Sequence, residues 1–260
     1  MRERLYRVEA IIIRRSDVGE ADRLLTVMTP ERGKLRVVAK GARKPSSRKT
    51  GHVELFNRTS LLIATGRELD IVTQADTLES FPGIRNDLDR LSYAYYFAEL
   101  LDRLTEDEEE NRPLYDLLVE ALRWLERTEH LPRTARLFEL RLLDVTGYRP
   151  QLYSCINCRR ELKPEENFFT PAGGGVLHPQ CRFSYQDARA LSLNALKVLR
   201  FLQNREQPEI ESLHLSAGVE AEVEEILHYN LAHSLERNLK SVAFLNTLRA
   251  GTMGSRAESG

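Results

Sequence analysis

The most informative segment of the chain, residues 8–39, reads VEAIIIRRSDVGEADRLLTVMTPERGKLRVVA. Apolar and β-branched residues gather at 8–13, 24–28 and 35–39, and each group predicts a β-strand. Residues 30–33, which contain a proline and a glycine, predict a tight turn that joins the second strand to the third. The segment therefore predicts the start of a β-domain.

Two more strands are predicted beyond this segment, at residues 53–64 and, after a turn at Gly66, at 69–75. Five short strands with tight hairpins favour a small closed or nearly closed β-barrel of the OB type. Barrels of this type commonly bind nucleic acid across one face with charged and aromatic groups. The large rings of the segment are Tyr6 and Phe56, and we expect both in the core rather than on a stacking platform.

A run of cations extends from residue 32 to residue 49 without a single Asp or Glu. Residues 1–80 hold 16 Lys and Arg against 11 Asp and Glu, whereas the whole chain has a formal net charge of −1. This asymmetry is typical of a polyanion-binding module joined to a scaffold, and a basic strand followed by a basic loop suits a phosphate backbone. The alternative is a solvated loop that serves solubility, although such surfaces usually mix both signs of charge.

The hydrophobic period becomes helical after residue 85. Five helices are predicted, with starts or caps at Asn86, Pro113, Pro132, Ser192 and Ser216. Their leucine stripes are expected to form core, and the acidic run at 106–110 is expected to be an exposed loop. The second part of the chain is therefore predicted to be a helical framework.

Two short knuckles interrupt the helical part. Cys155 and Cys158 form a CxxC pair, and His178 and Cys181 form an HxxC pair after 19 intervening residues that include three consecutive glycines. This spacing favours a tetrahedral Cys₃His zinc site, with a redox CxxC couple and ordinary buried thiols as alternatives. Four protein ligands leave no position for a substrate water, so the zinc would be structural.

Composition and motifs limit the function classes. The chain has 260 residues, 42% of them hydrophobic, which is enough to bury a core in two or three domains. No stretch approaches the roughly 20 apolar residues of a membrane span, and the charged first residues do not resemble a secretory signal, so we expect a cytoplasmic protein without membrane contact. The Walker and HExxH patterns are absent, which favours a protein without catalytic residues over a nuclease.

Three motifs in the β-rich part carry a resemblance to a known family: EAIIIRR at 9–15, GEADRLLTVMTP at 19–30 and GKLRVVAKGARKP at 33–45. GYRP at 147–150, the CxxC pair, the glycine run and LERNLKS at 235–241 extend the similarity over nearly the whole chain. The sequence resembles RecO, the bacterial recombination mediator family. Members with this knuckle typically carry four cysteines, and His178 stands where the third would be.

The resemblance implies a DNA-binding mediator of recombination repair, bacterial and associated with the nucleoid. Such proteins bind single- and double-stranded DNA, anneal complementary strands and, with RecR, help load RecA onto DNA coated by single-strand-binding protein. Annealing requires neutralised phosphates and free bases, so a basic surface that ignores sequence is sufficient. The predicted phosphate contacts are Arg14, Lys34, Arg36, Lys40, Arg43, Lys44, Arg48 and Lys49.

A protein-interaction adaptor with little annealing activity is the alternative function. The helical framework could recruit RecR and the acidic C-terminal tail of single-strand-binding protein, with Arg123, Arg133 or Arg136 as the cation beside an apolar pocket. The predicted fold is α+β and multidomain: an OB-type barrel followed by a helical domain with an inserted zinc knuckle. Its segments are residues 1–80 (barrel), 81–150 and 186–250 (helical domain), 151–185 (zinc-binding insertion) and 251–260 (disordered tail).

Overall fold

The computed structural model describes residues 5–254, which form two compact units. The first, called here the barrel unit, runs to Val145 and includes the short segment Gln207–Glu211. The second, called here the knuckle unit, contains Thr146–Glu206 and the chain from Ser212 onward. The five-segment division made from the sequence stays a prediction.

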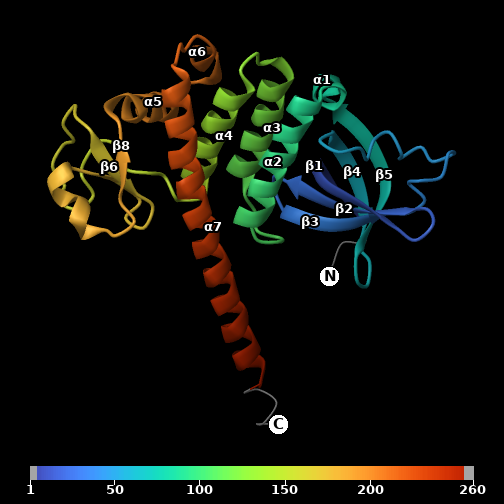
Figure 1. Ribbon diagram of the computed structural model, residues 1–260. Coiled ribbons are helices and arrows are strands. Elements are labelled where there is room, and N and C mark those ends of the chain that lie inside the picture. The colour runs from blue at the N-terminus through green and yellow to red at the C-terminus, as the bar shows by residue number, and fades with distance from the viewer. Residues whose placement is uncertain (1–4, 255–260) are drawn as a thin grey trace. The chain divides into compact units, whose positions relative to one another are not determined.

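The barrel unit begins with five strands that close into a barrel in the order β1-β2-β3-β5-β4 (Figure 1). The strands are β1 (Leu5–Val18), β2 (Asp22–Thr29), β3 (Gly33–Ala39), β4 (Arg58–Ala64) and β5 (Asp70–Glu79). Every pairing is antiparallel except β3 with β5. The predicted OB-type barrel is confirmed, although the strand predicted from residue 53 begins only at Arg58 because residues 53–57 turn.

The long strand β1 explains how the barrel joins the helices. Alternate side chains such as Val8, Ala10 and Ile12 enter the barrel core, as the period of two in a strand requires. Ile11 and Ile13 are also buried but point to the opposite face, where α2 (Leu88–Leu104) contacts β1. A strand that is apolar on both faces at its centre therefore lies between two cores.

Within residues 5–254, the barrel unit contains the three predicted helices, in the predicted order, and two short ones that were not predicted. They are α1 (Pro82–Asn86), α2, α3 (Arg112–Arg127), α4 (Leu131–Val145) and α6 (Gln207–Glu211). Asp87 caps α2 by accepting the amide hydrogens of Asp89 and Arg90, so the predicted cap at Asn86 is wrong by one residue. The rings of Phe97 and Phe138 stack with centroids 3.9 Å apart, which fixes α2 against α4.

The knuckle unit combines a small sheet with helices. Its strands β6 (Asn167–Thr170), β7 (Gly175–Leu177) and β8 (Arg189–Leu191) form a sheet in the order β7-β6-β8, and the 3₁₀ helix η1 spans Pro179–Ser184. Its helices are α5 (Leu193–Asn204) and α7 (Ala217–Gly254). The starts predicted at Ser192 and Ser216 are confirmed, since the Ser192 side chain accepts the Ala195 amide hydrogen and α7 begins one residue after Ser216.

Two sequence predictions concern the chain's end and membranes. The tail predicted for residues 251–260 falls partly within α7, which ends at Gly254, and partly outside the described residues. Among the helices of residues 5–254, none has an apolar stretch long enough to cross a membrane.

Candidate nucleic-acid interface and metal centre

The basic loop, defined here as residues 40–49, leaves the barrel at the end of β3. Its backbone is held in place: the Arg43 amide donates to the Ala21 carbonyl at 2.9 Å, and the Gly41 amide donates to the Asp22 carboxylate at 2.7 Å. Ala42 is fully buried in the barrel core. The loop is therefore anchored by an apolar side chain and by hydrogen bonds, while Lys40, Arg43, Lys44 and Arg48 are exposed.

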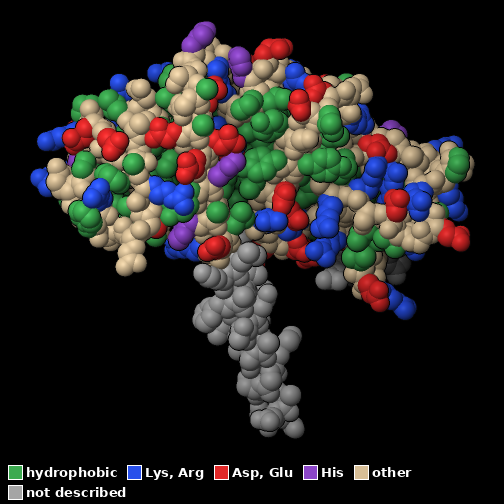
Figure 2. Space-filling view, viewed as in Figure 1, with side chains coloured by type: hydrophobic (Ala, Val, Ile, Leu, Met, Phe, Trp, Pro, Cys, Tyr) green, Lys and Arg blue, Asp and Glu red, His purple; other side chains and the backbone are tan. Residues whose placement is uncertain are grey.

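Four of the predicted DNA contacts are exposed and lack a partner within residues 5–254. None of their side chains makes a hydrogen bond or ion pair there, and Lys and Arg side chains gather over the barrel in Figure 2. These residues are Arg14, Lys40, Lys44 and Arg48. A cation whose charge is not already neutralised can exchange water and counterions for a phosphate.

Arg43 and Lys49 belong to the same loop but also hold it in place. The Arg43 guanidinium lies 3.3 Å from the Asp17 carboxylate and donates to the Gly19 carbonyl at 3.2 Å. The Lys49 ammonium donates to the Val72 carbonyl at 3.0 Å, and burial lowers the pKa of Lys49 below its ordinary value. Both side chains therefore already use part of their hydrogen-bonding capacity within the protein.

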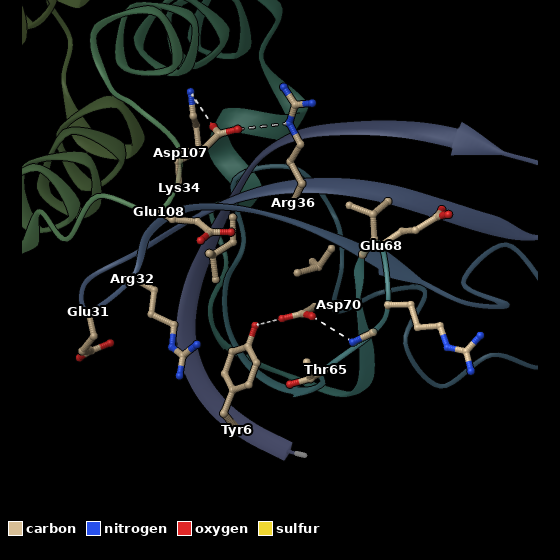
Figure 3. A pocket seen from close by; sticks show the side chains of 15 residues that line it. Tyr6, Glu31, Arg32, Lys34, Arg36, Thr65, Glu68, Asp70, Asp107 and Glu108 are labelled. Atoms are coloured by element: carbon tan, nitrogen blue, oxygen red, sulfur yellow. Dashed lines mark hydrogen bonds and ion pairs between the residues drawn. The ribbon is translucent and has the colours of Figure 1, made fainter. Parts of the chain in front are cut away.

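The two strand cations have a different environment, shown in Figure 3. Lys34 is buried, and its ammonium donates at 2.9 Å to both the carboxylate and the carbonyl of Asp102 and at 3.1 Å to the Thr105 carbonyl. Asp107 lies 3.2 Å from Lys34 and 3.8 Å from the exposed Arg36 guanidinium. The three ammonium protons of Lys34 are therefore used inside the protein.

The acidic residues 106–110 run along this part of β3 and are called here the acidic loop. Lys34 and Asp107 form a parallel bridge, and the Glu108 amide donates to the Lys34 carbonyl at 2.9 Å. Gly33 has φ of +58°, and a Cβ on it would lie 1.9 Å from the Glu109 carbonyl oxygen. The acidic loop is exposed, as predicted, but it is docked on the basic strand.

A cavity of about 770 Å³ opens where β3 and β5 separate (Figure 3). The Tyr6 hydroxyl donates to the Asp70 carboxylate at 2.6 Å, and the Arg32 guanidinium carbon lies 4.0 Å from the Tyr6 ring centroid. Burial raises the pKa of Tyr6, with the hydrogen bond to Asp70 acting in the same direction. Since cations and carboxylates alternate around the cavity, it is not a continuous phosphate-binding surface.

The four predicted metal ligands come together in the knuckle unit. One ligand atom from each of Cys155, Cys158, His178 and Cys181 lies within 4.8 Å of every other, and Cys158 Sγ is 3.5 Å from His178 Nδ1. Tetrahedral zinc with thiolate and imidazole ligands places the donor atoms about 3.5–3.8 Å apart. His178 Nε2 lies 2.9 Å from the Glu161 carbonyl, which orients the ring so that Nδ1 faces the sulfurs.

The local backbone conformation helps to form this cluster. Arg159 adopts a positive φ of 64°, and the Arg159 amide donates to the Cys155 carbonyl at 2.8 Å, which closes the first knuckle. Hydrogen bonds from Arg160, the backbone amide first, lower the pKa of Cys158 to about 6, which favours the thiolate that binds metal. A Cβ on Gly173 would lie 2.1 Å from Ile156 Cδ1, so the glycine run packs against the knuckle instead of merely connecting it.

The arginines considered for an acidic tail are already engaged in the barrel unit. Arg123 forms a bidentate pair with Glu79 at 2.8 and 2.7 Å, and Arg136 is buried with a nitrogen 2.7 Å from Glu139. Arg133 also takes part in other interactions. Their availability for a peptide carboxylate stays a prediction.

The fold and these clusters define a class: OB-barrel proteins joined to a helical framework with a Cys₃His cluster. Comparison with known families identifies the particular family within this class. A family model described as recombination protein O, N terminal, matches residues 1–81, and one described as recombination protein O, C terminal, matches residues 85–243. The chain belongs to the RecO family of DNA repair proteins, which gives it a role in recombination repair.

Individual relatives agree with this assignment. A DNA repair protein RecO of Roseiflexus sp. is 49% identical over 249 residues, which is 96% of this chain and 88% of the relative. Proteins of the same name from Desulforudis audaxviator and Dehalococcoides mccartyi are 40% and 35% identical over 94% of this chain, covering 97% and 96% of their own lengths. The similarity thus spans both compact units.

Proposed function

We propose that the basic loop binds the phosphates of single- and double-stranded DNA and that the protein thereby anneals complementary strands. The observation that supports this most strongly is a group of exposed cations without a hydrogen-bond or ion-pair partner in the described part of the chain: Lys40, Lys44 and Arg48 on the anchored basic loop, with Arg14 on β1. Arg36, Arg43 and Lys49 complete the proposed surface with the charge left by their internal contacts. Lys34 is not included because its ammonium is satisfied inside the barrel unit.

This arrangement suits annealing for a physical reason. Bringing two polyanions together requires cations, whereas base pairing requires that the protein leave the bases free. The large rings of the barrel, Tyr6 and Phe56, are 8% and 1% exposed, so neither offers a stacking platform. Binding should therefore fall steeply with salt and depend little on sequence.

Strand annealing by the purified full-length chain tests this proposal. Lys40→Glu/Lys44→Glu should slow annealing of complementary oligonucleotides at least tenfold. The matched variant Lys163→Glu/Lys197→Glu places the same charge change on exposed lysines of the knuckle unit and should anneal at the wild-type rate. Equal rates in the two variants, with both proteins folded by circular dichroism, would remove the basic loop from the function.

We also propose that Cys155, Cys158, His178 and Cys181 hold one Zn²⁺ ion with a structural role. The Cys₃His donor set and its interatomic distances fit that ion, and bound zinc would cross-link the two knuckles. His178→Cys should keep one zinc per chain by elemental analysis, whereas His178→Ala should lose it and melt at a lower temperature. Zinc absent from wild-type protein purified without chelators would contradict the assignment.

The proposed function also includes binding to protein partners. Family membership supports action with RecR to load RecA onto DNA coated by single-strand-binding protein, including contact with that protein's acidic C-terminal tail. If the adaptor role dominates, the wild-type protein will bind the tail peptide but will anneal complementary strands little faster than they anneal without protein. A calorimetric titration with the tail peptide beside a DNA titration separates the two functions.

A further inference from the structure

The knuckle unit contains a cavity of about 140 Å³ that none of the predicted DNA or metal residues lines. Its wall is formed by three segments that are distant in sequence: residues 147–149, the β6–β7 turn at 171–174, and one face of α7. The α7 residues are Asn230, His233, Ser234 and Arg237. The volume has room for one tetrahedral oxyanion and a water, given that water takes about 30 Å³ in the liquid.

Asn230 provides the first reason to assign a ligand to this cavity. Asn230 is 3% exposed, and its amide nitrogen Nδ2 has no hydrogen-bond partner among the residues that the structure describes. The neighbouring Ser234 hydroxyl donates to the Asn230 backbone carbonyl at 2.9 Å, so it does not satisfy that nitrogen. A buried donor without an acceptor destabilises the fold, and an acceptor bound in the cavity would remove that cost.

The charge of the lining gives the second reason. Arg149, His233 and Arg237 line the cavity, and its described lining contains no Asp or Glu. Arg149 and Arg237 take part in other interactions, but each guanidinium has five N–H groups and can serve a further acceptor. An occupant that meets two guanidiniums and an amide donor must be an acceptor with negative charge.

The β6–β7 turn is shaped independently of any ligand. The carboxylate of Asp187 accepts the Thr170 hydroxyl at 2.6 Å and the Ala172 amide at 2.9 Å, so this nearby acid is occupied in holding the turn. Gly147 and Gly174 have φ of +81° and +70°, and no atom lies within 4 Å of the position that a Cβ would take on either. The space beside these two glycines is therefore open.

We propose that this cavity binds one phosphate group, with Asn230 Nδ2 as the buried donor and Arg149 and Arg237 as the neutralising cations. The phosphate belongs either to a free phosphate or nucleotide, or to one phosphodiester of a DNA strand. Both sources present the same tetrahedral, acceptor-only chemistry to the donors. The proposal does not depend on the basic loop, because every residue that it uses lies in the knuckle unit.

Calorimetric titration of the full-length chain with inorganic phosphate, at constant ionic strength, tests the site. Wild-type protein and the charge-matched variant Lys163→Gln/Lys197→Gln should bind phosphate equally, because both lysines are exposed and neither lines the cavity. Asn230→Leu and Arg149→Gln/Arg237→Gln should each weaken binding at least tenfold. Since Arg149 and Arg237 are exposed, the double variant remains a fair test even if Asn230→Leu fails to fold.

A second arm identifies the source of the phosphate. If the site holds a DNA phosphodiester, Arg149→Gln/Arg237→Gln should reduce the salt dependence of oligonucleotide binding, log K against log salt, by about one phosphate contact, or 0.7–0.9. An unchanged slope beside weakened phosphate binding would assign the site to free phosphate or a nucleotide. Phosphate affinity that is the same in wild type, Arg149→Gln/Arg237→Gln and Lys163→Gln/Lys197→Gln, or no heat in any of them, would show a cavity that holds only water and would overturn the proposal.

Discussion

The two halves of the basic run differ in what surrounds their charges. In the strand half, Lys34 is buried and Arg36 shares the carboxylate of Asp107 with it. In the loop half, Lys40 and Lys44 are exposed and have no partner within residues 5–254. A run of cations that is continuous in the sequence thus becomes structural charge in one half and available charge in the other.

Topology explains the difference. β3 pairs with β5 only through Val37 and Val38, so its first half has an edge that the sheet does not cover. The acidic loop covers part of this edge with a backbone bridge at Lys34 and supplies carboxylates to the strand's cations. The basic loop, by contrast, is anchored mainly through backbone atoms and the apolar Ala42, which use none of the charge on Lys40, Lys44 or Arg48.

The largest effect is expected when the available half is neutralised. Lys44→Gln/Arg48→Gln should weaken binding of a single-stranded oligonucleotide roughly 100-fold in low salt and reduce the salt slope by about 1.4, since each lost phosphate contact removes about 0.7. Fluorescence anisotropy at four or more salt concentrations measures both quantities. Lys163→Gln/Lys197→Gln is the matched control, and an equal loss in that variant would mean that net charge rather than the loop determines affinity.

The structural half should respond in stability instead. Lys34→Met removes a cation that is 8% exposed from two carboxylates, and we expect unfolding of the barrel unit to become easier by about 2 kcal/mol. The value is below that of a fully buried pair because the side chains of Asp102 and Asp107 are 34% and 49% exposed and regain water.

Urea denaturation and anisotropy together test this assignment. DNA affinity of Lys34→Met should stay within twofold of wild type, and Arg36→Met, which removes an exposed cation from the same strand, should leave stability within about 0.5 kcal/mol. A Lys34→Met protein with wild-type stability and weakened DNA binding would place Lys34 on the DNA surface after all.

The contrast between the two halves of the basic run also shows which structural features could be predicted from the sequence. Strand alternation and hairpin turns predicted the barrel, because both signals are local and the barrel satisfies them with neighbouring strands. The ligand spacing likewise predicted the Cys₃His cluster, whose four ligand atoms the fold brings within 4.8 Å of one another. The barrel and the metal cluster could be predicted because each leaves a pattern of residue types and spacings that is visible in the sequence.

The partners of Lys34 could not be predicted in this way. Asp102 is 68 positions away in the sequence, and its pairing with Lys34 depends on how α2 ends beside β3. The small sheet of the knuckle unit was also missed, since strands of three or four residues give too short a pattern. The missing partner of Asn230 Nδ2 is likewise visible only once the buried neighbours are known.

A smaller effect is expected at the boundary between the halves. Asp107→Asn removes the carboxylate beside Arg36, while Lys34 keeps its bonds to Asp102 and Thr105. DNA affinity at low salt should therefore rise about two- to threefold, because one acid leaves the surface and Arg36 becomes available. The gain should shrink in Asp107→Asn/Arg36→Gln, and a gain of the same size in this double variant would show that Arg36 has no part in it.

The smallest effect is a pH dependence at Lys49, the loop cation that is partly buried. Burial lowers the pKa of Lys49, so above that value the free protein carries this lysine partly neutral, while nearby phosphates favour the protonated form. DNA binding then takes up a fraction of a proton, and affinity must fall as pH rises from neutrality toward the ordinary pKa of lysine. In the absence of DNA the sign is opposite: the unfolded chain binds more protons than the folded one, so stability gains from the same pH rise.

Anisotropy across this pH range should show a decline of up to twofold in wild type that is shallower in Lys49→Gln. The comparison needs constant ionic strength, because screening changes affinity in the same direction as deprotonation. An identical decline in both proteins would mean that Lys49 stays directed at the Val72 carbonyl when DNA is bound. It would then belong with Lys34 among the cations that hold the fold, and the boundary between the two halves would run through the loop itself.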